Sequence, residues 1–84
     1  MSDYTITLEK SARKFLKKQN PKIQTVILKA ISKLPDGTDI KKLQGYNLYR
    51  MRVGSMRIIY SINNDVRIIN IENIDNRGQI YKRY

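Results

Sequence analysis

The sequence predicts a small α+β domain in which a two-helix hairpin covers one face of a largely antiparallel, four-stranded sheet. Three observations predict it: an alternating apolar segment at the start of the chain, two amphipathic segments after it, and three alternating segments in the second half. A chain of 84 residues is one domain, and no linker or low-complexity tract divides it. The predicted order is β-α-α-β-β-β over residues 1–84.

The first strand and the first helix follow from a change of period. Residues 4–8 alternate apolar side chains with threonine, which is typical of a short strand. Residues 9–19 then gather their apolar side chains on one side of a predicted helix, with lysines and one arginine around the rest. The apolar residues of this helix are Ala12, Phe15 and Leu16.

The second helix has the clearest period of the chain. Asn20 is placed to cap it, and Pro21 is placed at its first turn. Residues 35–37, Pro-Asp-Gly, end it, and a polar connection through Lys41 and Lys42 leads to the sheet. The predicted core stripe consists of Ile23, Val26, Ile27, Ala30, Ile31 and Leu34.

Turn residues define two hairpins in the second half. A two-residue turn at Gly54-Ser55 places Arg52 opposite Arg57, and Arg50 on the same face as both. A second turn at Asn64-Asp65 would place Glu72 opposite Arg57. The face expected to pack on the helices carries Tyr49, Met51, Val53, Met56, Ile58 and Tyr60.

Composition excludes several classes of mechanism. The chain has no Cys and no His, so a disulfide framework, a thiol nucleophile, an imidazole base and an ordinary zinc site are excluded, and we expect no metal and no cofactor. No leader pattern or long apolar run is present, which predicts a cytoplasmic protein without membrane attachment. The formal net charge of +10 on a folded domain favours a polyanionic partner.

The cations are divided by type. Only Arg13 lies in the first 45 residues, beside nine lysines, whereas the later arginines have one lysine beside them, Lys82. Arginine grips phosphate bidentately and stacks on bases, so the shared face of Arg50, Arg52 and Arg57 favours anion binding. An ordinary solvated basic face is the alternative, and a partner chain could contact the isoleucines of the same face, Ile59 and Ile68.

Three segments together resemble the RelE/ParE toxin superfamily, specifically the RelE-like messenger-RNA endonucleases. They are residues 42–45 (Lys-Leu-Gln-Gly), residues 49–60 with their two arginines, glycine turn and third arginine, and residues 76–82 with Arg-x-x-x-Tyr. The resemblance implies a bacterial toxin that cleaves messenger RNA in the ribosomal A site. It also implies an inhibitory complex with a cognate antitoxin, which the charge of this chain predicts to be acidic.

The resemblance also implies the chemistry and the residue roles. The ribose 2′-hydroxyl attacks the adjacent phosphate without a metal, and the protein aligns the groups and neutralises the developing charge. The catalytic residues implied are Arg50, Arg52, Arg57, Arg77 and Tyr81. Further contacts to RNA are expected from Lys41, Lys42, Arg67, Lys82 and Arg83.

The general base stays open, because Asn76 stands where many relatives carry histidine and a guanidinium is a poor base. The candidates are Glu72, Asp75, a tyrosinate, or no dedicated base. Two other functions also stay open. One is a ParE-like inhibitor of DNA gyrase, and the other is a non-catalytic basic module that tracks the RNA backbone.

Overall fold

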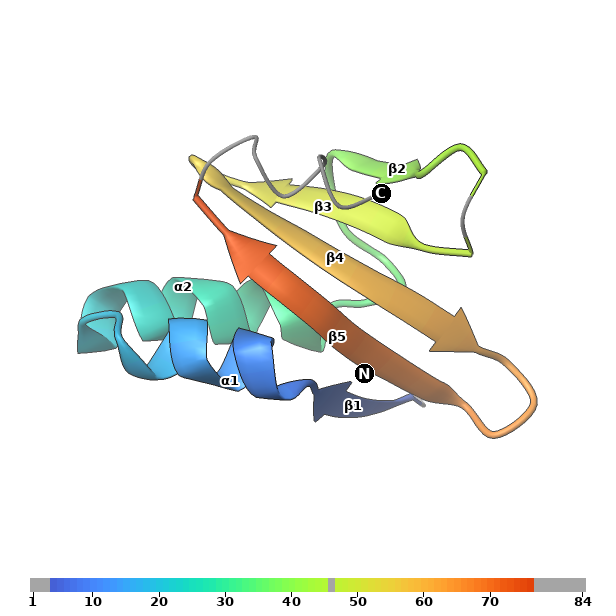
Figure 1. The fold of residues 1–84 in the computed structure, drawn as a ribbon, viewed down its shortest axis with the longest axis horizontal. Coiled ribbons are helices and arrows are strands. Elements are labelled where there is room, and N and C mark those ends of the chain that lie inside the picture. The colour runs from blue at the N-terminus through green and yellow to red at the C-terminus, as the bar shows by residue number, and fades with distance from the viewer. Residues whose placement is uncertain (1–3, 46, 77–84) are drawn as a thin grey trace.

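The computed structural model describes residues 4–45 and 47–76, and it confirms the α+β class. The elements are β1 (Thr5–Leu8), α1 (Lys10–Lys17), α2 (Pro21–Ser32), β2 (Ile40–Lys42), β3 (Tyr49–Val53), β4 (Met56–Asn63) and β5 (Ile68–Asp75). The sheet has the order β1-β5-β4-β3-β2, and only the β1–β5 pair is parallel. Both helices lie on one side of the sheet (Figure 1).

Within residues 4–45 and 47–76 the sheet already has five strands, so the prediction of four was wrong. The additional strand is β2, which pairs with β3 and places Lys41 opposite Arg50. It was expected to be a polar connection because it has three residues, two of them lysines. Lysine is common on edge strands, where its charge opposes pairing with other chains. The same lysines therefore made β2 look like a loop in the sequence.

The second helix begins as the sequence predicts. The side chain of Asn20 accepts a hydrogen bond from the Ile23 backbone N–H at 2.9 Å, and Pro21 occupies the first turn. Ile27 and Ile31 are buried against the sheet, but Val26, predicted to belong to the core stripe, is 42% exposed. The sheet covers a narrower strip of α2 than the apolar pattern suggests. Neither described helix has the length and apolar content that crossing a membrane requires.

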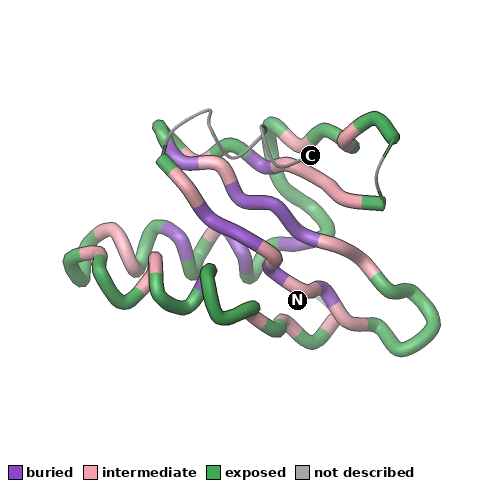
Figure 2. Tube along the Cα trace, in the orientation of Figure 1, coloured by how far each residue is buried: buried purple, intermediate pink, exposed green. Residues whose placement is uncertain are grey.

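The core lies between the helices and the middle of the sheet. Figure 2 shows the buried segments along β4 and β5 and on the sides of the helices that face them. Tyr60 is fully buried there and stacks on Tyr49 of β3, with ring centroids 5.5 Å apart. The described core residues are Ala12, Ile27, Ile31, Leu34, Met51, Met56, Ile58, Tyr60, Ile69, Ile71 and Ile74.

The β3–β4 hairpin has the predicted register. Val53 pairs with Met56, and Arg52 pairs with Arg57. Gly54 has φ +60°, a conformation that an L side chain strains to adopt, and glycine at the first loop position is typical of a type II′ turn. The two-residue turn therefore fixes which side chains share each face.

The β4–β5 hairpin differs from the prediction, because Asp75 and not Glu72 lies opposite Arg57. The loop is longer than two residues: the Asn63 side chain accepts hydrogen bonds from the backbone N–H groups that follow it, and Arg67 has φ +56°. The register also shifts between Ile59 and Tyr60, which is typical of a β-bulge. Both effects move β5 along β4.

Candidate nucleic-acid interface

Three arginines lie on the face of the sheet that the helices leave open. Arg52 and Arg57 are cross-strand partners, and Arg50 lies two residues from Arg52 on the same strand. Side chains two residues apart point to the same face of a strand, so the three guanidinium groups share this face, as the sequence predicts. Like charges placed directly opposite each other destabilise a sheet. We call Arg50, Arg52 and Arg57 the arginine face.

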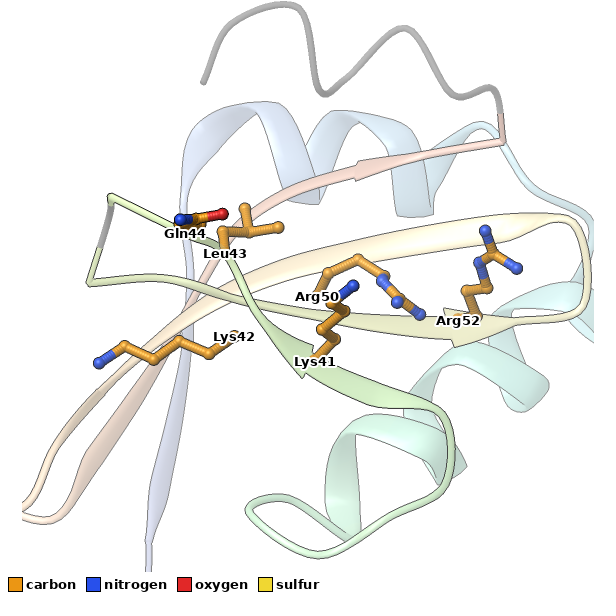
Figure 3. Close-up of a pocket in the computed structure, with 6 residues that line it drawn as sticks. All are labelled: Lys41, Lys42, Leu43, Gln44, Arg50 and Arg52. Carbon is orange, nitrogen blue, oxygen red and sulfur yellow. The ribbon is translucent and has the colours of Figure 1, made fainter.

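Strand β2 extends the arginine face at one edge. Lys41 pairs with Arg50 and lies on the same side, whereas Lys42 pairs with Tyr49 and alternates to the other side. In Figure 3 the Lys42 side chain extends away from Arg50 and Arg52. The structure thus brings together Lys41 and the three arginines, whereas Lys42 borders the same region with its side chain directed away.

Arg50 is held in place by Asp39, a residue that the sequence analysis did not single out. One nitrogen of Arg50, Nη1, donates to the Asp39 backbone oxygen at 3.1 Å and to the Asp39 carboxylate at 2.9 Å. Only 12% of the Arg50 side chain is exposed, against 54% for Asp39. The Asp39 backbone oxygen also accepts from the Arg52 backbone N–H at 3.1 Å. Asp39 therefore fixes both the strand edge and the guanidinium.

Asp75 places a carboxylate on the same face. It pairs with Arg57, which itself pairs with Arg52, so a row of two arginines and one aspartate crosses three strands. Side chains directly opposite each other in a sheet have Cβ atoms about 5 Å apart. Of the carboxylates considered as general bases, Asp75 is the one that the register places beside the arginine face.

Glu72 belongs to a separate network of hydrogen-bonded polar side chains further along β5. Its Oε2 atom accepts from Ser61 Oγ at 3.1 Å and from Asn70 Nδ2 at 2.7 Å. Asn70 also donates to Glu9 at 2.9 Å and accepts from Thr7 at 2.8 Å. This network ties β1, β4 and β5 together, and such fully bonded side chains are typical of a structural role.

The isoleucine between the arginines forms an apolar floor. Ile59 pairs with Arg50 and lies on the arginine face, yet it is fully buried and does not belong to the core cluster. The aliphatic stems of arginines can cover such a side chain while their charged ends stay accessible. Ile68, by contrast, is half-buried at the start of β5, near the other end of the sheet.

Arg67, another predicted residue, does not lie at the arginine face. Arg67 lies in the loop that follows β4. The last residue of β4, Asn63, is about 20 Å along the strand from Arg57. The guanidinium carbon of Arg67 lies 4.4 Å from the centre of the Tyr4 ring, a cation–π contact. The other predicted residues, Arg77, Tyr81, Lys82 and Arg83, lie outside the described residues.

Sequence reasoning missed two features of this face. Asp39 lies in a turn and has φ +56°, a conformation for which aspartate is enriched, but nothing in the sequence links it to Arg50. An open depression of about 290 Å³ next to Arg50 is lined by Leu43 and Gln44 as well as by cations. Finding it required the pairing of β2, which the sequence does not reveal.

Comparisons with known proteins agree with this architecture. A family model described as the ParE toxin of the type II toxin–antitoxin system parDE matches residues 6–81. A search of curated proteins finds no match.

Solved structures show the same likeness. The chain is 32% identical to a chain of the RelB–RelE antitoxin–toxin complex from Methanococcus jannaschii, with a TM-score of 0.72, covering 93% of this chain and 98% of that one. It is 27% identical to a chain of the archaeal RelE–RelB complex from Pyrococcus horikoshii OT3, with a TM-score of 0.75 and coverages of 90% and 97%. The isolated Escherichia coli RelE toxin shares the fold, with 16% identity, a TM-score of 0.73 and coverages of 95% and 93%.

Proposed function

The chain belongs to the ParE toxin family of type II toxin–antitoxin systems, within the RelE/ParE superfamily, and from this premise we propose that it is a metal-independent endoribonuclease that cleaves messenger RNA in the ribosomal A site. The observation that carries the proposal is the arginine face: three guanidinium groups on one side of β3 and β4, with Lys41 beside them. Guanidinium groups fixed on strands can stabilise charge that develops on a phosphate.

The proposed reaction needs alignment and charge neutralisation. The 2′-oxygen attacks the adjacent phosphorus, the bond from phosphorus to the 5′-oxygen breaks, and a 2′,3′-cyclic phosphate remains. Arg52 and Arg57 hold the non-bridging oxygens, and Arg50 binds the neighbouring backbone. Asp75 supports the step as the acceptor of the 2′-hydroxyl proton, because the register places it beside Arg57. The departing 5′-oxygen takes a proton from solvent.

The partners follow from the same charges. A net charge of +10 favours binding to ribosomal and messenger RNA, and it also favours an acidic antitoxin that neutralises the toxin until needed. Several of the similar solved structures are toxin–antitoxin complexes, which supports an antitoxin partner and a hetero-oligomeric resting state. Such an activity takes place in the cytoplasm.

Inhibition of DNA gyrase is the second candidate. The observation that favours it is the match to a family model whose description is the ParE toxin of the parDE system. The arginine face favours RNA cleavage instead, because several cations on one face can stabilise the charge that develops on a phosphate.

The deciding experiment adds the purified protein to a reconstituted bacterial translation reaction, with and without ribosomes. New 5′ ends on the message are mapped by primer extension. The variants Arg52→Gln and Arg57→Gln are compared with Arg13→Gln, which removes the same charge from an exposed site on α1. We expect cuts within A-site codons that need ribosomes, and a loss of about 100-fold for either sheet variant, the scale of losing one transition-state donor.

The controls separate the alternatives. Arg13→Gln should keep its cleavage rate within about three-fold, since a distant exposed charge acts only through the screened field. A gyrase supercoiling assay is run with the same samples. Intact messages together with inhibited gyrase would overturn the ribonuclease in favour of the second candidate. RNA binding without cuts, weakened only modestly in both sheet variants, would identify a plain binding module.

A further inference from the structure

The depression beside the arginine face has two chemically different ends. It measures about 290 Å³ and is lined by Lys41, Lys42, Leu43, Gln44, Arg50 and Arg52. Figure 3 shows Leu43 and Gln44 toward one end, Arg52 at the other, and Lys41 and Arg50 between them. Ligand pockets start at roughly 300 Å³, so the depression has room for one nucleotide-sized group and not for a length of chain.

The cationic end is suited to phosphate alone. Arg52 is exposed, and Lys41 lies across the strand pair from Arg50. Contacts of cations to phosphate position a nucleic acid but do not distinguish its bases. A site for the backbone alone would be expected to carry cations along its whole length, whereas one end of this depression is lined by the uncharged residues Leu43 and Gln44.

The other end has the groups that a base requires. Leu43 is half-buried and offers an apolar surface, and Gln44 is exposed and offers both a donor and an acceptor. Within residues 4–45 and 47–76, the Gln44 amide makes no hydrogen bond. Unstacked RNA bases are recognised through contact with their faces and hydrogen bonds to their edges.

The hairpin that carries Gln44 is fixed next to the depression. The Leu43 backbone N–H donates to the Leu48 oxygen at 2.9 Å, which closes the connection between β2 and β3. Gly45, which follows Gln44, has φ +81°, so the chain turns directly after the amide. Lys41, two residues before Leu43, is held in the sheet by its pairing with Arg50. The amide therefore lies in the connection that joins the two strands carrying the cations.

We propose that this depression is a nucleobase subsite that binds the base of a nucleotide next to the phosphate on the arginine face. Leu43 contacts the face of the base, and the Gln44 amide pairs with its edge, while Arg50 and Arg52 bind the backbone phosphates on either side of it. A side-chain amide matches the adjacent acceptor and donor of adenine, so adenine is the preferred base. The inference rests on the proposed function for its substrate class, and it adds the residue that selects the base.

The test measures binding without cleavage. The probes are fluorescent 2′-O-methyl trinucleotides that carry adenine, uracil or no base at the middle position, and anisotropy gives each Kd for the full chain. The 2′-O-methyl group removes the nucleophile, so the result does not depend on catalysis. We expect the adenine probe to bind about five-fold tighter than the abasic one, the lower end of the discrimination that a bidentate amide pair supplies.

Three variants locate the effect. Gln44→Met keeps the bulk of the side chain and should abolish the preference for adenine over uracil while leaving the Kd of the abasic probe unchanged. Asn47→Ala removes an exposed amide from the same connection and should change nothing. Arg52→Gln should weaken all three probes by a similar factor. In NMR spectra, the Gln44 side-chain amide resonance should shift with the adenine probe and not with the abasic probe.

The outcomes separate the two proposals. Equal Kd values for all three probes, each weakened by Arg52→Gln, would overturn the nucleobase subsite and leave the phosphate-binding face intact. No binding of any probe at 50 mM salt would overturn the subsite and count against the proposed ribonuclease as well. An adenine preference that survives Gln44→Met would also overturn the assignment to Gln44.

Discussion

The two faces of strands β3 and β4 use neighbouring residues for opposite purposes. Ile58 is fully buried under the helices, while Arg57, one residue earlier, lies on the open face with Arg52. The inner face gains stability from the removal of apolar surface from water, and the outer face concentrates like charges that cost stability. Side-chain alternation thus lets five- and eight-residue strands carry both a core and a surface lined with arginines.

The largest effect on stability is expected from the inner face. Ile58→Ala should lower the free energy of unfolding by about 2–5 kcal/mol, because it removes buried methyl groups and leaves a cavity. Urea denaturation followed by circular dichroism measures the loss. A domain of this size has only a few kcal/mol of net stability, so Ile58→Val, with an expected loss of about 1 kcal/mol, serves if the alanine variant does not fold. A loss below about 0.3 kcal/mol for Ile58→Val would contradict the assignment of Ile58 to the core.

Asp39 tests whether the outer face is prearranged. Asp39→Asn keeps a residue that tolerates positive φ but weakens the contact to Arg50, so the ribosome-dependent cleavage rate should fall about ten-fold, the scale of one charge-assisted hydrogen bond. In an Arg50→Ala background the same change should have no further effect, because Asp39 acts through Arg50. Equal losses in both backgrounds would show that Asp39 acts independently of Arg50.

The like charges of the outer face predict a smaller effect of opposite sign on stability. Arg52→Gln should raise the free energy of unfolding by about 0.2–1 kcal/mol at low salt, since it removes the repulsion with Arg57 while keeping the side-chain length. In 1 M salt the screening length is only about 3 Å, and the gain should vanish. Thermal melts at both salt concentrations measure it, with Arg13→Gln as the matched control. A gain that persists in 1 M salt would argue against a charge effect.

The smallest effect concerns a buried tyrosine of the inner face. Burial, and then the neighbouring Tyr49, raise the pKa of Tyr60 to about 12 from 10. The folded state therefore favours the neutral phenol, so its contribution to stability is complete below pH 10 and is lost as pH rises toward 12. Among the described residues, the Tyr60 hydroxyl has no hydrogen-bond partner, so Tyr60→Phe costs little at pH 7.

The comparison with Tyr60→Phe isolates the effect of this one hydroxyl from every other effect of raising the pH. Urea midpoints are measured for both proteins at pH 8 and pH 11. The wild type should lose more stability than Tyr60→Phe between these values. Parallel losses in the two proteins would mean that Tyr60 ionises without opposing the fold.

The two hairpins show how far the sequence alone could go. The β3–β4 register was predictable, because Gly54 permits a two-residue turn and the position of that turn determines every residue pair between the two strands. The β4–β5 register was not, because side-chain bonds from Asn63 set a longer loop and a bulge adds a further shift. One signal was present: the buried isoleucines Ile69, Ile71 and Ile74 are spaced by two and then by three residues. A change of spacing on one buried face is typical of a bulge.

The sequence predicted the arginines of the candidate site, but it did not predict which carboxylates lie beside them. The shared face of Arg50, Arg52 and Arg57 followed from alternation over one turn. The contacts of Asp39 and the alignment of Asp75 depend on a loop conformation and on a shifted register, which are properties of tertiary structure. The strand β2 was missed for a related reason, since three residues pair only because β3 offers them an edge.

The parallel pairing of β1 with β5 has a consequence for when the domain can complete its sheet. Strand β1 has its partner in β5, the last of the described strands, and α1 packs mainly on that same strand. During synthesis from the N-terminus, β1 and α1 must wait until β5 has left the ribosome. Asp75, opposite Arg57, is supplied by the end of β5. Thr5 pairs with Ile68, so the sheet of the nascent chain cannot close before β5 has been synthesised.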